Sequence, residues 1–359
     1  MKYTKLQLLE KLSLLFGPSG CEGEVRELIK EQIGHYTDSE YSDFMGNYIV
    51  RINGKTDKKM MIAAHMDEVG FMISHIDEGG YLYFQPVGGF DPKVLCGRKV
   101  TVFGKGKEKL CGLIASKAIH QQSPEERKTP TPVNKMYIDI GAKDKEDAEK
   151  YVEIGDFATF DSEFIQFGNG MIKGKAIDDR LGCAIMCDII RHIRENGITP
   201  DFTLYFCFTT REEISRSGAN LAVNYVKPDM ALTLESTAIA DIFGTPPHKK
   251  AGKLGSGPCI SLMDNGTVYL KEAVEFALET AKRHGDTCQL KKYVSGGTDA
   301  AHIHKAVGGV ITVNMACPTR YIHSASCVID GKDFGYMYEL ALHIALADVN
   351  DSPVCKKGI

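Results

Sequence analysis

His65 and Asp67 lie in the segment A-A-H-M-D-E-V-G at residues 63–70, directly after the apolar run Met60–Ala64. Residues i and i+2 of a strand share one face, so the imidazole and the carboxylate are expected to point the same way at a strand's carboxyl end. Imidazole is a good zinc ligand, and a carboxylate behind its ring fixes the tautomer. A surface histidine near an ordinary turn aspartate would have the same local sequence. The interpretation as a metal site therefore depends on further residues elsewhere in the chain.

Two pairs of adjacent carboxylates give that support. Asp178 and Asp179 stand just before a predicted helix, where an aspartate either caps the helix or bridges two metal ions. Glu212 and Glu213 follow the apolar run Phe202–Phe208, which is typical of a buried strand. One of these glutamates could bind a metal while the other takes a proton from the attacking water, and a solvated charged loop is the alternative.

Two single residues complete the set. Glu235 follows the apolar run Met230–Leu234, with Asp241 as a nearby competitor, and His323 lies in the segment Arg320–Ser324 after a predicted strand. Because an open α/β sheet gathers the carboxyl ends of its strands at one edge, we expect all these side chains to meet. Two histidines, one bridging aspartate and two terminal carboxylates would make a two-metal site. Ligands without a thiolate suit Zn²⁺, Co²⁺ or Mn²⁺.

The elements that must position these residues alternate between helices and buried strands in the first and last parts of the chain. Helices are expected at residues 4–16, 23–36, 180–196, 217–225, 270–284, 298–305 and 332–349. Strands are expected at residues 47–52, 60–64, 202–208, 230–234, 288–293 and 309–315. This alternation predicts an α/β fold.

The middle of the chain has a different texture. Short strand-like runs, broken by Gly, Pro and Asp, occur at residues 71–76, 81–85, 98–103, 110–115, 136–140 and 157–160, with one helical run at 145–152. Strands at this spacing predict a small barrel or sandwich. We therefore expect an insertion at residues 69–170 that divides a catalytic domain into residues 1–68 and 171–359.

The composition excludes several classes of protein. A chain of 359 residues predicts two domains, and a net charge of −4 with no long basic block argues against nucleic acid as a partner. No apolar segment is long enough to span a membrane, and we expect the amino-terminal stretch to form an amphipathic helix and not a signal peptide. The 11 cysteines are scattered singly, which predicts a reducing, cytoplasmic location.

Six motifs in fixed order then resemble one family. They are G-P-S-G at 17–20, H-M-D-E-V-G-F at 65–71, G-K-A-I-D-D-R-L-G-C at 174–183, E-E at 212–213, G-G-T-D-A-A at 296–301 and R-Y-I-H-S at 320–324. With them, nearly the whole chain resembles the M42 family of metallo-aminopeptidases, which includes the tetrahedral (TET) or deblocking aminopeptidases, the glutamyl aminopeptidases and proteins termed cellulase M. The resemblance implies a mixed-sheet α/β metallopeptidase catalytic domain with an inserted small β-barrel dimerisation domain.

The resemblance also implies a role for each candidate residue. Two divalent ions, Zn²⁺ or Co²⁺ with Mn²⁺ as an alternative, would be held by His65, Asp178, Glu213, Glu235 and His323. Asp178 would bridge the ions, with Asp179 as the alternative. Glu212 would be the general base, and Asp67 would orient His65.

Three positions depart from the family pattern. Glu235 stands where the family usually has Asp, and the segment 214–218, I-S-R-S-G, lacks the usual Gly two residues after the paired Glu. Ser324-Ala325 replaces a usual Ser-Pro. None of these changes removes a proposed ligand, but the first two adjoin the expected metals and base.

The predicted function is removal of N-terminal amino acids from short peptides by a dimer that assembles into a tetrahedral dodecamer. His120 could reach a neighbouring active site in such a shell, or it is an ordinary loop histidine. An endo-1,4-glucanase is the enzymatic rival, but glycosidases usually need no metal, and the chain has no Trp to stack on sugars. A non-catalytic, metal-stabilised assembly protein is the second rival. The preferred N-terminal residue and the native metal stay open.

Overall fold

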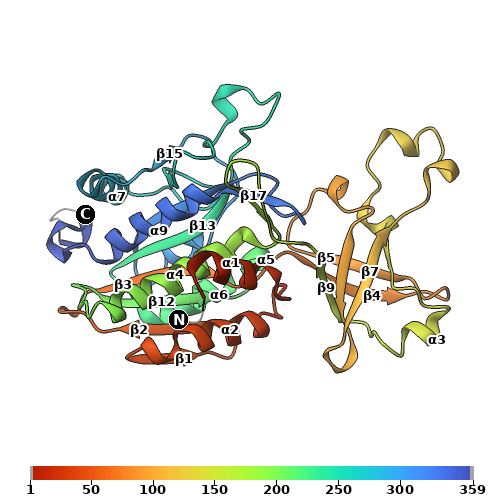
Figure 1. Cartoon of the computed structure of the whole chain (residues 1–359), viewed down its shortest axis with the longest axis horizontal. Coiled ribbons are helices and arrows are strands. Elements are labelled where there is room, and N and C mark those ends of the chain that lie inside the picture. Colours follow the sequence, from red (N-terminus) through yellow and green to blue (C-terminus); the bar gives the residue numbers. More distant parts are fainter. Residues whose placement is uncertain (1–2, 356–359) are drawn as a thin grey trace.

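A mixed eight-stranded sheet forms the centre of the larger part of the chain in this computed structural model, which describes residues 3–355 (Figure 1). In spatial order its strands are β1 (Ser39–Ser42), β2 (Tyr48–Ile52), β12 (Thr203–Thr209), β3 (Lys59–His65), β13 (Met230–Ala238), β16 (Ile311–Thr319), β14 (Cys259–Ser261) and β15 (Gln289–Lys291). The four central strands β12, β3, β13 and β16 are parallel to one another. Their carboxyl ends therefore meet at one edge of the sheet.

Helices cover both faces of this sheet, which explains why its central strands are apolar on both sides. Met60 and Ile62 of β3 belong to the core under one set of helices, and Met61 and Ala63 to the core on the opposite face. The first face is covered by α1 (Lys5–Leu14), α2 (Gly23–Ile33), α4 (Ile177–Glu195), α7 (Lys271–His284) and α9 (Gly331–Ala345). The opposite face is covered by α6 (Ser217–Val226) and α8 (Ala300–Ile303).

A closed six-stranded barrel projects from one side of this α/β body (Figure 1). Around the barrel the strands are β4 (Gly70–Ile76), β5 (Leu82–Val87), β8 (Tyr137–Asp139), β7 (Lys109–Ala115), β6 (Lys99–Phe103) and β9 (Phe157–Phe160). The barrel has its own apolar core, which includes Phe71, Ile73 and Val100, and a short helix α3 (Lys145–Ala148). All six strands fall inside the expected insertion, whose limits at residues 69 and 170 stay a prediction.

A small third sheet pairs β10 (Ile165–Phe167), β11 (Met171–Gly174) and β17 (Cys327–Asp330). Its strand β11 leads directly into α4, and β17 leads into α9. A four-residue helix, α5 (Glu212–Ser215), follows β12. In the described part of the chain no helix has the length and apolar character of a membrane span, and all 11 cysteines are free.

The expected fold class is confirmed, with differences at the ends of elements. The predicted helix at 23–36 is α-helical only to Ile33, and a 3-10 turn, Gly34–Tyr36, follows it. The predicted helix at 298–305 is shorter, whereas the predicted strand at 230–234 continues to Ala238. Glu235 therefore lies inside β13 instead of following it.

Candidate active site

His65 is the last residue of β3, beside Thr209 at the end of the parallel strand β12. The ring is almost fully buried, and its Nδ1 lies 3.1 Å from the backbone carbonyl oxygen of Asp67. Its Nε2 faces two carboxylates: Asp178 Oδ1 at 3.4 Å and Glu235 Oε2 at 3.6 Å. Because Nδ1 is held by the backbone, Nε2 is the nitrogen that is free to bind a ligand.

A second cluster forms around His323, which lies in the loop between β16 and β17. Its Nε2 is 3.4 Å from Asp178 Oδ2 and 3.2 Å from Glu213 Oε2. Its Nδ1 lies 2.9 Å from the carbonyl oxygen of Gly89, in the segment between barrel strands β5 and β6. The barrel part of the chain thus orients one of the two histidines.

Asp178 belongs to both clusters, and its neighbour Asp179 belongs to neither. Each oxygen of Asp178 faces a different histidine, as a bridging carboxylate requires. Asp179 instead accepts backbone N–H bonds from Gly182 at 3.0 Å and from His65 at 3.3 Å. Asp179 is thus bonded to backbone groups of α4 and β3, whereas Asp178 joins the clusters.

The carboxylate of Asp67 holds the paired glutamates in place. It accepts the backbone N–H of Glu212 at 3.0 Å, that of Glu213 at 3.1 Å and the hydroxyl of Ser19 at 2.6 Å. The sequence predicts that Asp67 orients His65, and its Oδ1 lies 3.5 Å from the ring Nδ1. The carbonyl oxygen of the same residue is closer to the ring, so the carboxylate acts mainly on the Glu212–Glu213 turn.

Glu212 is buried beside both clusters and forms an ion pair that sequence reasoning missed. Its Oε1 accepts a hydrogen bond of 2.7 Å from Arg216 Nε. Arg216 lies in the segment that departs from the family pattern, and its φ of 54° places it in the left-handed region between α5 and α6. The difference of this segment from the family pattern was the only feature of the sequence that pointed to this contact.

The remaining candidates lie outside the clusters. Asp241 forms an ion pair of 2.6 Å with Arg320, so it does not compete with Glu235. His120 is exposed in the connection between β7 and β8. Sequence reasoning also gave no role to Asp299 of the G-G-T-D-A-A motif. Its backbone N–H donates to Glu235 Oε1 at 3.3 Å.

Both clusters have the donors that divalent cations require. In each of them one atom per residue lies within 4.8 Å of the others. His65 Nε2 and Asp178 Oδ1 are buried without a hydrogen-bond partner in the described part of the chain, which is costly unless a ligand binds them. Burial raises the pKa of Glu213 to about 8, which reflects the cost of charging a carboxylate here without a cation. The residues therefore fit two divalent ions.

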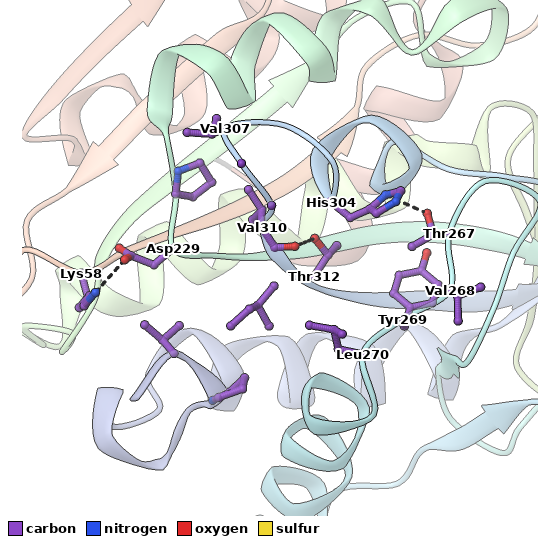
Figure 2. A pocket seen from close by; sticks show the side chains of 16 residues that line it. Lys58, Asp229, Thr267, Val268, Tyr269, Leu270, His304, Val307, Val310 and Thr312 are labelled. Atoms are coloured by element: carbon purple, nitrogen blue, oxygen red, sulfur yellow. Dashed lines mark hydrogen bonds and ion pairs between the residues drawn. The ribbon is translucent and has the colours of Figure 1, made fainter. Parts of the chain in front are cut away.

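A cavity of about 310 Å³ opens beside the clusters, lined by Glu212, Glu235 and His323 among others. A second cavity, about 650 Å³ in volume, lies elsewhere, where β13 and β16 begin (Figure 2). It contains an ion pair of 2.8 Å between Lys58 and Asp229, and none of its lining residues belongs to a metal-type cluster. The candidate residues therefore gather at the smaller cavity.

Sequence comparison finds relatives over most of the chain. A family model described as M42 glutamyl aminopeptidase matches residues 46–340. An Acetivibrio thermocellus protein named as a candidate aminopeptidase is 37% identical, over 88% of this chain and 91% of that protein. The glutamyl aminopeptidase of Lactococcus lactis is 29% identical over 92% of this chain and 93% of its own length. The lysyl aminopeptidase of Pyrococcus furiosus is 28% identical over 93% of this chain and 95% of its own length.

Solved structures share the fold over nearly its full length. A TET aminopeptidase from a marine sediment archaeon of the Thaumarchaeota has a TM-score of 0.93 at 35% identity, covering 97% of both chains. The TET1 peptidase of Pyrococcus horikoshii has a TM-score of 0.86 at 30% identity, covering 96% of this chain and 99% of that chain. It is described as assembling into a tetrahedron or a large octahedral shell. A Thermotoga maritima protein described as an endoglucanase has a TM-score of 0.76 at 34% identity, covering 94% of this chain and 96% of that chain.

Proposed function

This chain belongs to the M42 peptidase family and is a peptide hydrolase of the aminopeptidase type, and on that premise we propose that it works with two metal ions and a glutamate base. One observation carries the proposal: two histidine–carboxylate clusters share Asp178, and a buried glutamate outside both clusters, Glu212, lies beside them. This arrangement provides ligands for two ions and leaves one carboxylate free to move protons.

In this mechanism His65, Asp178 and Glu235 would hold one ion, and Asp178, Glu213 and His323 would hold the other. When bound, two such ions would supply Lewis acidity at the scissile carbonyl and at the attacking water. Zn²⁺ and Co²⁺ suit these ligands best, with Mn²⁺ as the alternative. Glu in place of the usual Asp at position 235 reaches further into the site, so the metal preference is expected to depend on this residue.

Glu212 moves the proton. Its Oε1 is bonded to Arg216, so its Oε2 is the oxygen that accepts the proton of the attacking water. The same atom then returns the proton to the leaving amine. Asp67 keeps Glu212 in position through the backbone N–H, and the free α-amine of the substrate binds beside Glu235.

The experiment that tests the function is hydrolysis of aminoacyl p-nitroanilides by chelated enzyme that is resupplied with Zn²⁺, Co²⁺ or Mn²⁺. We expect metal-dependent release from substrates with a free amino terminus and none from amino-blocked ones. If folded protein that binds two ions released nothing with any metal, the proposal would be wrong and a non-catalytic role would replace it.

The endoglucanase alternative makes the opposite prediction for chelation. One structural relative is described by that name, but glycoside hydrolysis usually needs two carboxyl groups and no metal. Cellulose hydrolysis that survives removal of the metals would support the alternative. Loss of peptide hydrolysis under the same treatment supports the aminopeptidase.

The assembly proposed for this chain is a dimer formed through the barrel, and twelve chains in a tetrahedral shell. The support is the TET1 relative, which is described as forming such a shell, and the barrel that projects from the α/β body. Enclosure in a shell would restrict substrates to peptides that can enter. Light scattering after size-exclusion chromatography measures the number of chains directly.

A further inference from the structure

The G-P-S-G motif at residues 17–20 has no part in the proposed mechanism, but its segment is connected to the active site. The motif lies in the connection between α1 and α2, where Ser19 and Glu22 are both buried. The Ser19 hydroxyl donates to Asp67 Oδ2 at 2.6 Å, and Asp67 in turn accepts the backbone N–H of Glu212. One carboxylate therefore links this connection to the proposed base.

Glu22 makes a second link to the same turn. Only 4% of this residue is exposed, and its Oε1 accepts the backbone N–H of Gly20 at 2.7 Å and that of Arg211 at 3.2 Å. Burial and the nearby charge of Asp67 raise the pKa of Glu22 to about 7, and no cation among residues 3–355 forms an ion pair with it. Because a buried carboxylate is costly unless it accepts hydrogen bonds, these two N–H groups hold Glu22 in place.

Three consecutive backbone N–H groups at the start of α5 are bound in this way by two buried carboxylates. Glu22 accepts the N–H of Arg211, and Asp67 accepts those of Glu212 and Glu213. Arg211 lies in the left-handed region with a φ of 58°, which is unfavourable for a residue that has a Cβ atom. Such a conformation persists only where the surrounding contacts enforce it. The hydrogen bond to Glu22 is one of these contacts.

The conformation of Arg211 determines where the base and its partner lie. Glu212 is the next residue, so a change of the backbone angles at Arg211 would move its side chain relative to both clusters. The carbonyl oxygen of Arg211 also accepts the backbone N–H of Arg216 at 2.9 Å, and the Arg216 side chain donates to Glu212 Oε1. A turn that relaxed at Arg211 would therefore displace both the base and the guanidinium group that orients it.

We propose that Glu22 is a positioning residue for the reaction: by accepting the Arg211 N–H, it holds the left-handed turn from which Glu212 reaches the attacking water. The inference rests on the proposed function, because it needs Glu212 as the general base. Glu22 is not among the residues that line the active-site cavity, so it acts through the backbone of Arg211 and not on the substrate. The reaction requires an acceptor oxygen at position 22, and not a negative charge.

The sharpest test compares Glu22→Met with Glu22→Gln. Methionine has nearly the same length but no oxygen that accepts a hydrogen bond, whereas glutamine keeps an oxygen in the place of Oε1. With metal-loaded enzyme and an aminoacyl p-nitroanilide, Glu22→Met should lower kcat by on the order of 10- to 100-fold, the range for a misplaced catalytic group. KM should change little, and both ions should stay bound. Glu22→Gln should recover most of the loss in kcat.

Further variants serve as controls for this pair. Glu27→Met removes a carboxylate from the same helix, α2, whose side chain is 66% exposed, and it should keep the wild-type kcat. Glu22→Met is also introduced into Glu212→Gln, where it should cause no further fall in kcat because no base is left to position. If Glu22→Met does not fold, Glu22→Asp takes its place. Its carboxylate is one methylene shorter and cannot meet the Arg211 N–H in the same place, so kcat should fall although the charge is kept.

The outcomes separate the two proposals. If no substrate is hydrolysed with any metal, the proposed function fails. If Glu212→Gln lowers kcat but Glu22→Met lowers only the melting temperature, the function stands and the inference is overturned. Loss of an ion in Glu22→Met, or an equal fall in kcat within the Glu212→Gln background, would also overturn it, because Glu22 would then act on something other than the base. A fall in kcat that Glu22→Gln shares in full would assign the effect to the charge and contradict the inference.

Discussion

The adjacent residues Asp178 and Asp179 have different side-chain contacts because the backbone of α4 is not helical at these two positions. Both lie at non-helical φ and ψ values, so the two side chains diverge. Asp178 reaches both histidines, and Asp179 accepts the backbone N–H of Gly182 in the first turn of α4. Local sequence could not separate these roles, because aspartate suits a cap and a bridge equally well.

Glu212 is the residue on which the proposed proton transfer depends. Glu212→Gln keeps the shape of the side chain but cannot accept the proton, so kcat should fall on the order of 10²- to 10⁴-fold. Because Glu212 belongs to neither cluster, the variant should still bind two ions per chain. The measurement pairs steady-state kinetics with metal analysis of the same sample. Full activity with both ions bound would assign the base elsewhere.

Arg216 positions the base and does not need to touch the substrate to matter. Arg216→Met removes the hydrogen bond to Glu212 Oε1 and leaves that carboxylate free to rotate. We expect kcat to fall by on the order of 10- to 100-fold with little change in KM, because the loss lies in orientation. Arg216→Lys should recover part of the loss. A purely structural role would instead lower the melting temperature and leave both constants of the folded fraction unchanged.

Five expected ligands lie close together, as their positions at or after predicted strands indicate. The contacts of Arg216 and Glu22 could not be predicted in this way. His65 and Glu235 follow or end apolar runs whose strands are parallel neighbours, so topology alone gathers them. Arg216 and Glu22 approach the base from a left-handed turn and from the connection between α1 and α2. Their partners are set by three-dimensional packing, which spacing in the sequence does not encode.

At the level of elements, the long apolar strands and amphipathic helices were predictable, and the short exposed strands were not. Every residue of β1 and of β10 is exposed, so neither shows the alternation that marks a half-buried strand. The three-residue strand β14 is too short to give a period. Choosing a barrel over a sandwich required the pairing of β4 with β9, which closes the sheet.

A buried network of ion pairs and hydrogen bonds connects α1, α4 and the end of β3. Glu68 binds Lys175 at 2.6 Å and lies 3.5 Å from Arg180. Arg180 also donates to the carbonyl oxygens of Leu12 in α1 and of Met66 after β3. The network thus ties the start of α4, and with it Asp178, to the end of the strand that carries His65.

Breaking this network should destabilise the fold strongly. Glu68→Gln leaves two buried cations without their carboxylate, which costs about 3–5 kcal/mol in comparable sites. The control is Glu24→Gln at the partly exposed pair of Glu24 with Lys109, 2.8 Å apart, where a loss of about 1 kcal/mol or less is expected. Urea denaturation of both variants measures the two losses. Equal losses would mean that the buried network has no special role.

At the scale of the whole molecule, the barrel contributes to the active site as well as projecting from the α/β body. Gly89 contacts the His323 ring from the segment between β5 and β6. Phe90, the next residue, stacks on Phe71 of the barrel core with ring centroids 4.9 Å apart. The position of one proposed metal ligand therefore depends on barrel packing, which a division of the chain into a catalytic and a dimerisation domain does not anticipate.

The two proposed ions should also stabilise the whole fold. Without cations, Asp178, Glu213 and Glu235 place three carboxylates around two histidines inside the protein, an arrangement that burial disfavours. A ligand that binds only the folded state adds about 2.7 kcal/mol at one hundred times its dissociation constant. Chelation should therefore lower the melting temperature, and added Zn²⁺ or Co²⁺ should restore it.

Two variants determine whether that stabilisation comes from the clusters. Glu212→Gln should gain as much stability from added metal as the wild type, because Glu212 is not a proposed ligand. Asp178→Asn should lose most of the gain, because both clusters share this carboxylate. Differential scanning calorimetry with and without metal measures each gain. An equal gain in Asp178→Asn would mean that the ions bind elsewhere on the molecule, and the shared-aspartate site would have to be abandoned.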